Sequence, residues 1–203
     1  PWTPPDEGFY MTDAISDYAV RWIDEHDSNH DQSPFFLYVP YTAPHWPLHA
    51  LPEDIATYEG VYDVGWDSLR VLRHDRLIQM GLIQADTKLS DRTPGIPEWS
   101  EVDDKDEWTR RMQVYAAMVD RMDQGIGSIL DALRMRGLLE QSIVFFISDN
   151  GGSAESVVAR GLNHPESVIG ERTSYAGYRE PWANASNTPF RLYKAQAYEG
   201  GIA

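Results

Sequence analysis

Cysteine is absent from the 203-residue chain. Its absence excludes disulfides, thiolate zinc sites and a cysteine nucleophile within these residues. No apolar run reaches the ~18 to 20 residues of a membrane-spanning helix, so we expect no membrane partner. Positive charge is also scarce, because 17 Lys and Arg stand against 32 Asp and Glu, a formal net charge of −15. We therefore expect no nucleic-acid partner, since phosphate binding needs a cationic surface.

Apolar and aromatic residues are plentiful. They make up 42% and 12% of the chain, with seven Trp and eleven Tyr, which argues for a folded protein rather than a disordered one. The length is enough for one domain with a core, or for a large part of a bigger domain. If the substrate is an anion, a bound cation or a few well-placed Lys, Arg or His residues must offset the repulsive field.

Two short apolar runs flank a long amphipathic helix. The runs, Phe35–Val39 and Ile143–Ile147, are typical of strands buried on both faces, as in a parallel sheet. Between them, apolar residues recur at alternating spacings of four and three from Trp108 to Leu133, which predicts one continuous helix ending near Gly137. Strands joined by a helical crossover indicate an α/β fold with a mostly parallel sheet.

The remaining segments give weaker patterns. We predict a helix that begins at a cap on Thr12 or Asp13 and ends near Glu25. Residues 54–81 should be helical in pieces, broken near Gly60 and Gly65. Residues 84–106 are expected to form an irregular excursion, and residues 161–203 to be mostly loop.

A possible cation site follows the second predicted strand. Ligands of such sheets bind at the carboxyl ends of the strands, where residues 40–49 and 148–152 both lie. Asp149 and Asn150 offer oxygen donors there, and the two glycines after them allow close backbone approach. Oxygen donors favour a hard cation such as Ca²⁺ or Mg²⁺. From these residues alone, an ordinary turn explains the segment at least as well.

Two further residues are candidates for proton transfer and anion binding. His45 has a proline on either side, and its restricted backbone suits a group that moves a proton near neutral pH. A loop histidine packed against Trp46 is an equally good interpretation. Lys194 is suited to binding an anionic oxygen, although a surface lysine would look the same. Trp46 and Trp182 are hypothesised to line a mouth for an aryl or sugar ring.

Taken together and in order, these segments resemble the sulfatases, specifically the bacterial arylsulfatases of the alkaline-phosphatase-like superfamily. The resemblance rests on residues 34–48, 115–123, 145–152 and 191–202, with residues 8–13 as a lead-in. It implies a three-layer αβα fold with a mostly parallel sheet. Residues 1–203 would be the central portion of one incomplete sulfatase catalytic domain.

The resemblance also implies a reaction and a role for each matching residue. The reaction is hydrolysis of a small-molecule aryl or alkyl sulfate ester to an alcohol and sulfate. Asp149 and Asn150 would bind a single Ca²⁺, or Mg²⁺, and Asp149 would also help to activate the nucleophile. His45 would protonate the leaving alcohol, and Lys194 would bind a sulfate oxygen.

The chain departs from the family in one important respect. Sulfatases use a formylglycine made from the first residue of a Cys/Ser-x-Pro/Ala-x-Arg motif, and no such motif occurs here. The paired aspartates that complete the family's metal site are absent too. The chain begins at Pro1 rather than Met, and Ala203 stands where the family has Arg. We therefore expect an internal portion of a longer enzyme, inactive by itself, with its nucleophile upstream.

Two alternatives stay open. A phosphatase or phosphodiesterase of the same superfamily would carry Asp-His-Gly at this strand end, because imidazole suits zinc. Asn150 in place of that histidine favours the sulfatase interpretation. The other alternative is a non-catalytic homologue, which only the upstream sequence would reveal. The residues leave open both a homo-oligomer and the cellular compartment.

Overall fold

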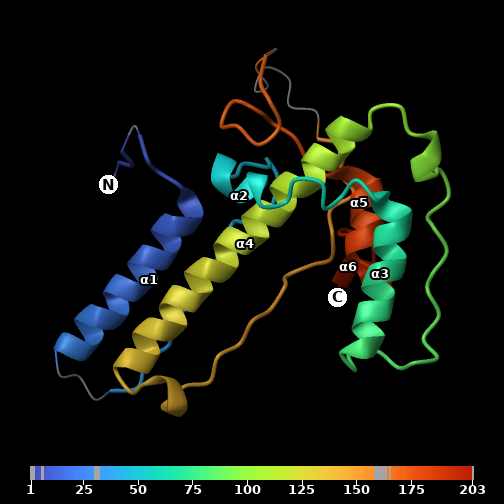
Figure 1. Cartoon of the computed structure of the whole chain (residues 1–203). Coiled ribbons are helices and arrows are strands. Elements are labelled where there is room, and N and C mark those ends of the chain that lie inside the picture. The colour runs from blue at the N-terminus through green and yellow to red at the C-terminus, as the bar shows by residue number, and fades with distance from the viewer. Residues whose placement is uncertain (1–2, 6, 30–32, 158–163, 165, 203) are drawn as a thin grey trace. The chain divides into compact units, whose positions relative to one another are not determined.

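The chain divides into two compact units. A computed structural model describes every residue except 1–2, 6, 30–32, 158–163, 165 and 203 (Figure 1). The first unit consists of Pro1–Pro44 and Met118–Phe146, and the second of His45–Ala117 and Ile147–Ala203. Within the described ranges, no helix is both long enough and apolar enough to cross a bilayer.

The first unit is built on helix α1 (Met11–Ser28) and the second half of helix α4 (Lys105–Met135). The buried residues of α1 follow one another at spacings of four, three and four, which places them on one helical face. They are Thr12, Ser16, Ala19 and Ile23. The two helices approach closely, because a Cβ on Gly125 would lie 2.1 Å from Ser16 Oγ. The 3₁₀ turn η2 (Leu139–Gln141) completes this unit.

Two arginines, one in α4 and one directly after it, form ion pairs with α1. Arg121 donates from two nitrogens to the two carboxylate oxygens of Asp13, both at 2.7 Å. Arg136, near the end of α4, pairs with Asp24. Because the residue numbers rise together on both helices, α1 and this part of α4 run in the same direction (Figure 1). Each partly exposed pair contributes at most about 1 kcal/mol, so apolar burial does most to hold the helices together.

The second unit contains α2 (Pro52–Ala56), α3 (Gly65–Gln79), η1 (Trp99–Glu101), the first half of α4, α5 (Arg179–Ser186) and α6 (Glu199–Ile202). Helices α3 and α5 pack side by side (Figure 1). Trp66 and Trp182 are fully buried at the centre of this unit. The Trp66 ring meets three other indoles edge to face, with centroids 4.7 to 5.5 Å apart, an arrangement that ring quadrupoles favour.

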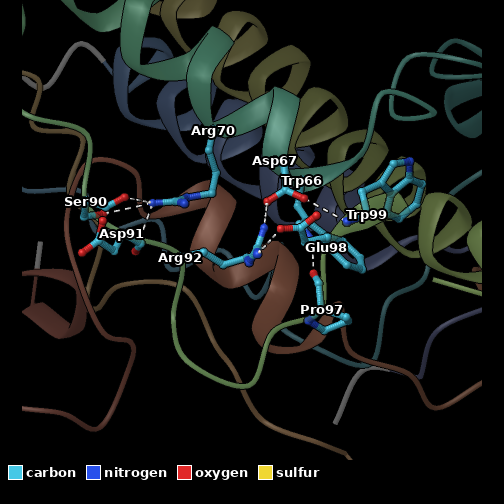
Figure 2. Close-up of polar contacts among 9 residues, drawn as sticks. All are labelled: Trp66, Asp67, Arg70, Ser90, Asp91, Arg92, Pro97, Glu98 and Trp99. Atoms are coloured by element: carbon cyan, nitrogen blue, oxygen red, sulfur yellow. Dashed lines mark hydrogen bonds and ion pairs between the residues drawn. The ribbon is translucent and has the colours of Figure 1, made fainter. Parts of the chain in front are cut away.

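Side chains of α3 anchor the irregular segment that follows it (Figure 2). Arg70, only 5% exposed, donates to the carbonyl and the hydroxyl of Ser90. Asp67 accepts from Arg92 at 2.6 Å and from the Trp99 backbone N–H at 2.9 Å. The same network includes contacts of Asp91, Pro97, Glu98 and Trp66. The segment is therefore irregular, as predicted, but firmly attached.

The predicted parallel sheet is not confirmed. Among the described residues there is no β-strand, and the one isolated bridge joins His49 to Gly170. In Phe35–Val39, Phe35 and Leu37 pack on the core of the first unit, while Phe36 and Tyr38 are 88% and 75% exposed. In Ile143–Ile147 all five side chains are exposed. Strands need neighbours for their backbone hydrogen bonds, and the described residues offer none to either run.

Of the helix predictions, two are confirmed and one is wrong. The long helix is confirmed, and so are the breaks near Gly60 and Gly65. The proposed cap on α1 is wrong, because Tyr10 is the N-cap and makes no side-chain cap, and the helix continues past Glu25 to Ser28. Helix α5 was not predicted, since its Pro, Asn and Ser residues are typical of loops. Burial of Trp182, Ala183 and Ala185 stabilises it instead.

Candidate functional site

All four predicted site residues belong to the second unit, and two of them touch. Lys194 Nζ lies 3.1 Å from His45 Nε2, although 149 positions separate the residues in the sequence. His45 is exposed and Lys194 is partly buried. The structure thus joins the candidate proton donor to the candidate anion-binding group.

The contacts of His45 define which ring nitrogen carries its hydrogen. His45 Nδ1 lies 2.6 Å from the carbonyl oxygen of Trp46, which only accepts hydrogen bonds. Nδ1 must therefore be protonated. When the ring is neutral, Nε2 presents a lone pair, and the Lys194 ammonium donates to it. The Trp46 carbonyl in this way fixes both the tautomer and the direction of the ring.

A carboxylate that the sequence analysis missed lies beside this pair. Glu155 Oε2 accepts hydrogen bonds from Trp46 Nε1–H at 2.7 Å and from Ser153 Oγ–H at 2.8 Å. These two hydrogen bonds hold the pKa of Glu155 below its usual value, and the charges of Lys194 and His45 lower it further. The exposed carboxylate consequently stays ionised next to the His45–Lys194 pair. Nothing in the local sequence distinguishes Glu155 from the chain's many other acidic residues.

The predicted cation-binding residues supply two oxygen donors of suitable chemistry. The Asp149 carboxylate is exposed, and Asn150 uses its Nδ2 on the Gly151 carbonyl, which leaves the amide oxygen available. Hard cations such as Ca²⁺ take six to eight oxygen ligands. No group of three or more His, Cys, Asp or Glu suited to a metal occurs among the residues described. Asp149 and Asn150 fit a hard cation as part of a larger ligand set.

Backbone hydrogen bonds join the loop that carries Asp149 and Asn150 to the lysine segment. The Lys194 N–H donates to the Gly152 carbonyl at 3.0 Å, and the Gly151 N–H donates to the Gly201 carbonyl at 3.3 Å. Such close approach requires glycine. A Cβ on Gly151 would lie 1.8 Å from the Gly200 carbonyl oxygen, and one on Gly152 would lie 2.4 Å from the Tyr178 hydroxyl. The paired glycines in both segments are thus explained by packing.

One earlier hypothesis is wrong. Trp182 does not line a mouth for a ring, because it is fully buried and donates its indole hydrogen to the Trp108 carbonyl at 2.8 Å. Trp46 is partly buried, and its ring lies 5.8 Å from that of Tyr175, edge to face. Of these two tryptophans, Trp46 is the one beside the His45–Lys194 pair, with its ring 4.8 Å from that of His45.

Comparison with known proteins identifies the family. The family model described as Sulfatase matches residues 1–203. This chain belongs to the sulfatase family. It is 34% identical over 198 residues to an uncharacterized sulfatase of Schizosaccharomyces pombe, with 91% of this chain and 36% of that protein covered. It is 31% identical over 212 residues to an arylsulfatase of Klebsiella aerogenes, with 98% and 44% covered. The sulfatase chain thus spans less than half the length of these two relatives.

A solved structure supports the fold. The sulfatase chain is similar to the crystal structure of Ps i-CgsB, which was determined in complex with k-i-k-neocarrahexaose. The TM-score is 0.52 at 24% sequence identity, and the similarity covers 98% of this chain and 28% of that one. This similarity concerns the fold alone, and no β-strand occurs among the described residues.

Proposed function

We propose that this sulfatase chain forms the central portion of a catalytic domain that hydrolyses aryl or alkyl sulfate esters to an alcohol and sulfate. The observation that carries the proposal is the contact of 3.1 Å between Lys194 Nζ and His45 Nε2. The backbone bond from Lys194 to Gly152, beside Asp149 and Asn150, supports the same assignment. A relative named arylsulfatase also favours it.

The His45–Lys194 pair suits the departure of an alcohol. In sulfate-ester cleavage the bridging oxygen gains negative charge, so groups that stabilise or protonate it accelerate the reaction. The Lys194 ammonium would bind a sulfate oxygen and offset that charge. Protonated His45 would then donate its Nε2 hydrogen to the leaving oxygen, while Nδ1–H stays bonded to the Trp46 carbonyl.

Asp149 and Asn150 would contribute two ligands to a bound Ca²⁺ or Mg²⁺, together with further ligands outside this chain. The ion would supply positive charge to the sulfate oxygens. A formylglycine hydrate from a segment upstream of these residues would serve as the nucleophile, and Asp149 would assist its activation. By this proposal, the 203 residues alone do not turn over substrate.

Substitution of His45 in the complete enzyme tests the role of the imidazole. His45→Ala should slow hydrolysis of an alkyl sulfate much more than that of an activated aryl sulfate, because a poor leaving group depends more on protonation. General acid catalysis contributes about a hundredfold to ten-thousandfold, so the alkyl substrate should lose on this order. Equal losses of kcat/KM on the two substrates would contradict the proposed role.

Metal content distinguishes the phosphatase alternative. Asn150 presents an amide oxygen, which favours a hard cation over zinc. The purified complete enzyme should contain calcium or magnesium and should prefer sulfate esters to phosphate esters. Zinc in stoichiometric amount would refute the sulfatase proposal, and a failure to cleave any sulfate ester would favour the non-catalytic homologue.

A further inference from the structure

Asn187 lies between three segments of the candidate site. It directly follows α5, and its own N–H donates to the Ala183 carbonyl at 3.0 Å. Its backbone is therefore fixed by the helix. From this point its side chain extends toward the loop of residues 149–152 and the segments around Lys194 and Gly200.

The Asn187 amide makes three hydrogen bonds, and all three partners are backbone groups. Its Oδ1 accepts from the Gly152 N–H at 2.8 Å. Its Nδ2 donates to the Leu192 carbonyl at 2.8 Å and to the Gly200 carbonyl at 2.7 Å. Both amide hydrogens are thereby used. Because two carbonyls face one end of the amide and an N–H faces the other, the orientation of the group is determined by its partners.

No other side chain of this size offers the same set of groups. Aspartate has the right shape but no hydrogens to donate, so it would set a carboxylate against two carbonyl oxygens. Glutamine carries the same amide on a longer stem, which would displace the amide from its three backbone partners. The amide also lies close to both glycines. A Cβ on Gly152 would already lie 2.9 Å from Asn187 Oδ1, and one on Gly151 would lie 3.3 Å from Asn187 Nδ2.

We propose that Asn187 is a positioning residue that keeps Lys194 in register with the loop carrying Asp149 and Asn150. Gly152 lies two positions after Asn150, and Leu192 lies two positions before Lys194. One amide thus holds both sides of the candidate site, and the Lys194 N–H bond to the Gly152 carbonyl depends on it. The inference about catalysis rests on the proposed function, whereas the inference about register does not.

Amide hydrogen exchange on this chain tests whether Asn187 keeps Lys194 aligned with the loop of residues 149–152. The reporters are the N–H groups of Lys194 and Gly200, which bond to Gly152 and Arg191 and not to Asn187 itself. In Asn187→Ala both should exchange at least about tenfold faster, the effect of losing one hydrogen bond on a local opening. The control is Asn184→Ala, a buried asparagine of α5 whose side chain interacts with Thr93 and Tyr193 rather than with the loop of residues 149–152. It should leave both reporters within about twofold of the unsubstituted chain.

Kinetics of the complete enzyme test the catalytic consequence. Asn187→Ala should lower kcat on an aryl sulfate by about a hundredfold, the effect of misplacing a catalytic group by about 1 Å, while Asn184→Ala changes kcat little. Unchanged exchange at Lys194 in Asn187→Ala, or equal effects of the two variants, would overturn the proposal. If the unsubstituted enzyme hydrolyses no sulfate ester, the proposed function fails, and the exchange experiment still decides whether Asn187 sets the register. Should Asn187→Ala fail to fold, Asn187→Asp replaces it, with the same expected outcomes.

Discussion

A single methyl group at Gly151 should separate the loop of residues 149–152 from the segment around Gly200. In Gly151→Ala the new Cβ would lie 1.8 Å from the Gly200 carbonyl oxygen and 2.7 Å from the Gly200 carbonyl carbon. Both obstacles are backbone atoms, so no rotamer change removes the clash. Three hydrogen bonds depend on the present spacing: Gly151 to Gly201, Gly152 to Asn187, and Lys194 to Gly152. At about 1 kcal/mol each, their loss should cost about 3 kcal/mol.

Urea unfolding of the chain measures this cost, with Gly127→Ala as the matched control. Gly127 lies in α4, and a Cβ there would meet nothing within 4 Å. Alanine is a better helix former than glycine by about 1 kcal/mol, so the control should be unchanged or more stable. A Gly151→Ala variant as stable as the Gly127→Ala variant would refute the packing argument.

Two further predictions concern tryptophans of the second unit. Trp46→Phe keeps an aromatic ring but removes the hydrogen bond to Glu155, so the pKa of Glu155 should rise toward its usual value, as followed by carboxyl carbon NMR. Because that pKa is lowered in the folded chain, the stabilising effect is full above the ordinary carboxyl pKa and is lost as pH falls through the lowered value. An unchanged titration of Glu155 would contradict this. Trp66→Ala empties a site that is fully buried and should cost about 3 to 5 kcal/mol in urea unfolding. A cost below about 1 kcal/mol would show that the Trp66 site collapses or stays flexible.

The sequence predicts those parts of the fold that depend on local spacing. The long helix is an example, because the apolar residues from Trp108 to Leu133 repeat at helical intervals and Gly137 ends the pattern. Helix α5 was missed because its stability comes from burial of Trp182 and its neighbours, which no local pattern reveals. The composition of the two apolar runs is typical of strands, but a sheet also needs neighbouring strands, and the described residues contain none.

In the candidate site, too, the residues with a local signal could be predicted, and those that depend on contacts made after folding could not. His45, Asp149, Asn150 and Lys194 were chosen from local chemistry and from the resemblance to sulfatases, and the structure brings His45 and Lys194 into contact. The residues that hold these side chains and their segments in place, Glu155 and Asn187, could not be recognised from the sequence. Glu155 is one acidic residue among 32 Asp and Glu, and Asn187 follows a segment that reads as a loop. Their importance depends on contacts across 109 and 35 positions, which arise only after folding.

The glycine packing around Gly151 has an evolutionary consequence. Substitutions at Gly151, Gly200 and Gly201 each direct a new side chain at backbone oxygens, at 1.8 to 2.3 Å, and no second-site change of a side chain relieves such a clash. These three glycines should therefore not be replaced by other residues during evolution. Asp149 and Asn150, by contrast, are at least partly exposed, and the Asn150 amide contacts the glycines through one hydrogen bond, from Nδ2 to the Gly151 carbonyl at 3.2 Å. By the proposed function, a lineage built on this scaffold should alter its metal preference by exchanging Asp149 and Asn150 while the glycines beside them stay the same.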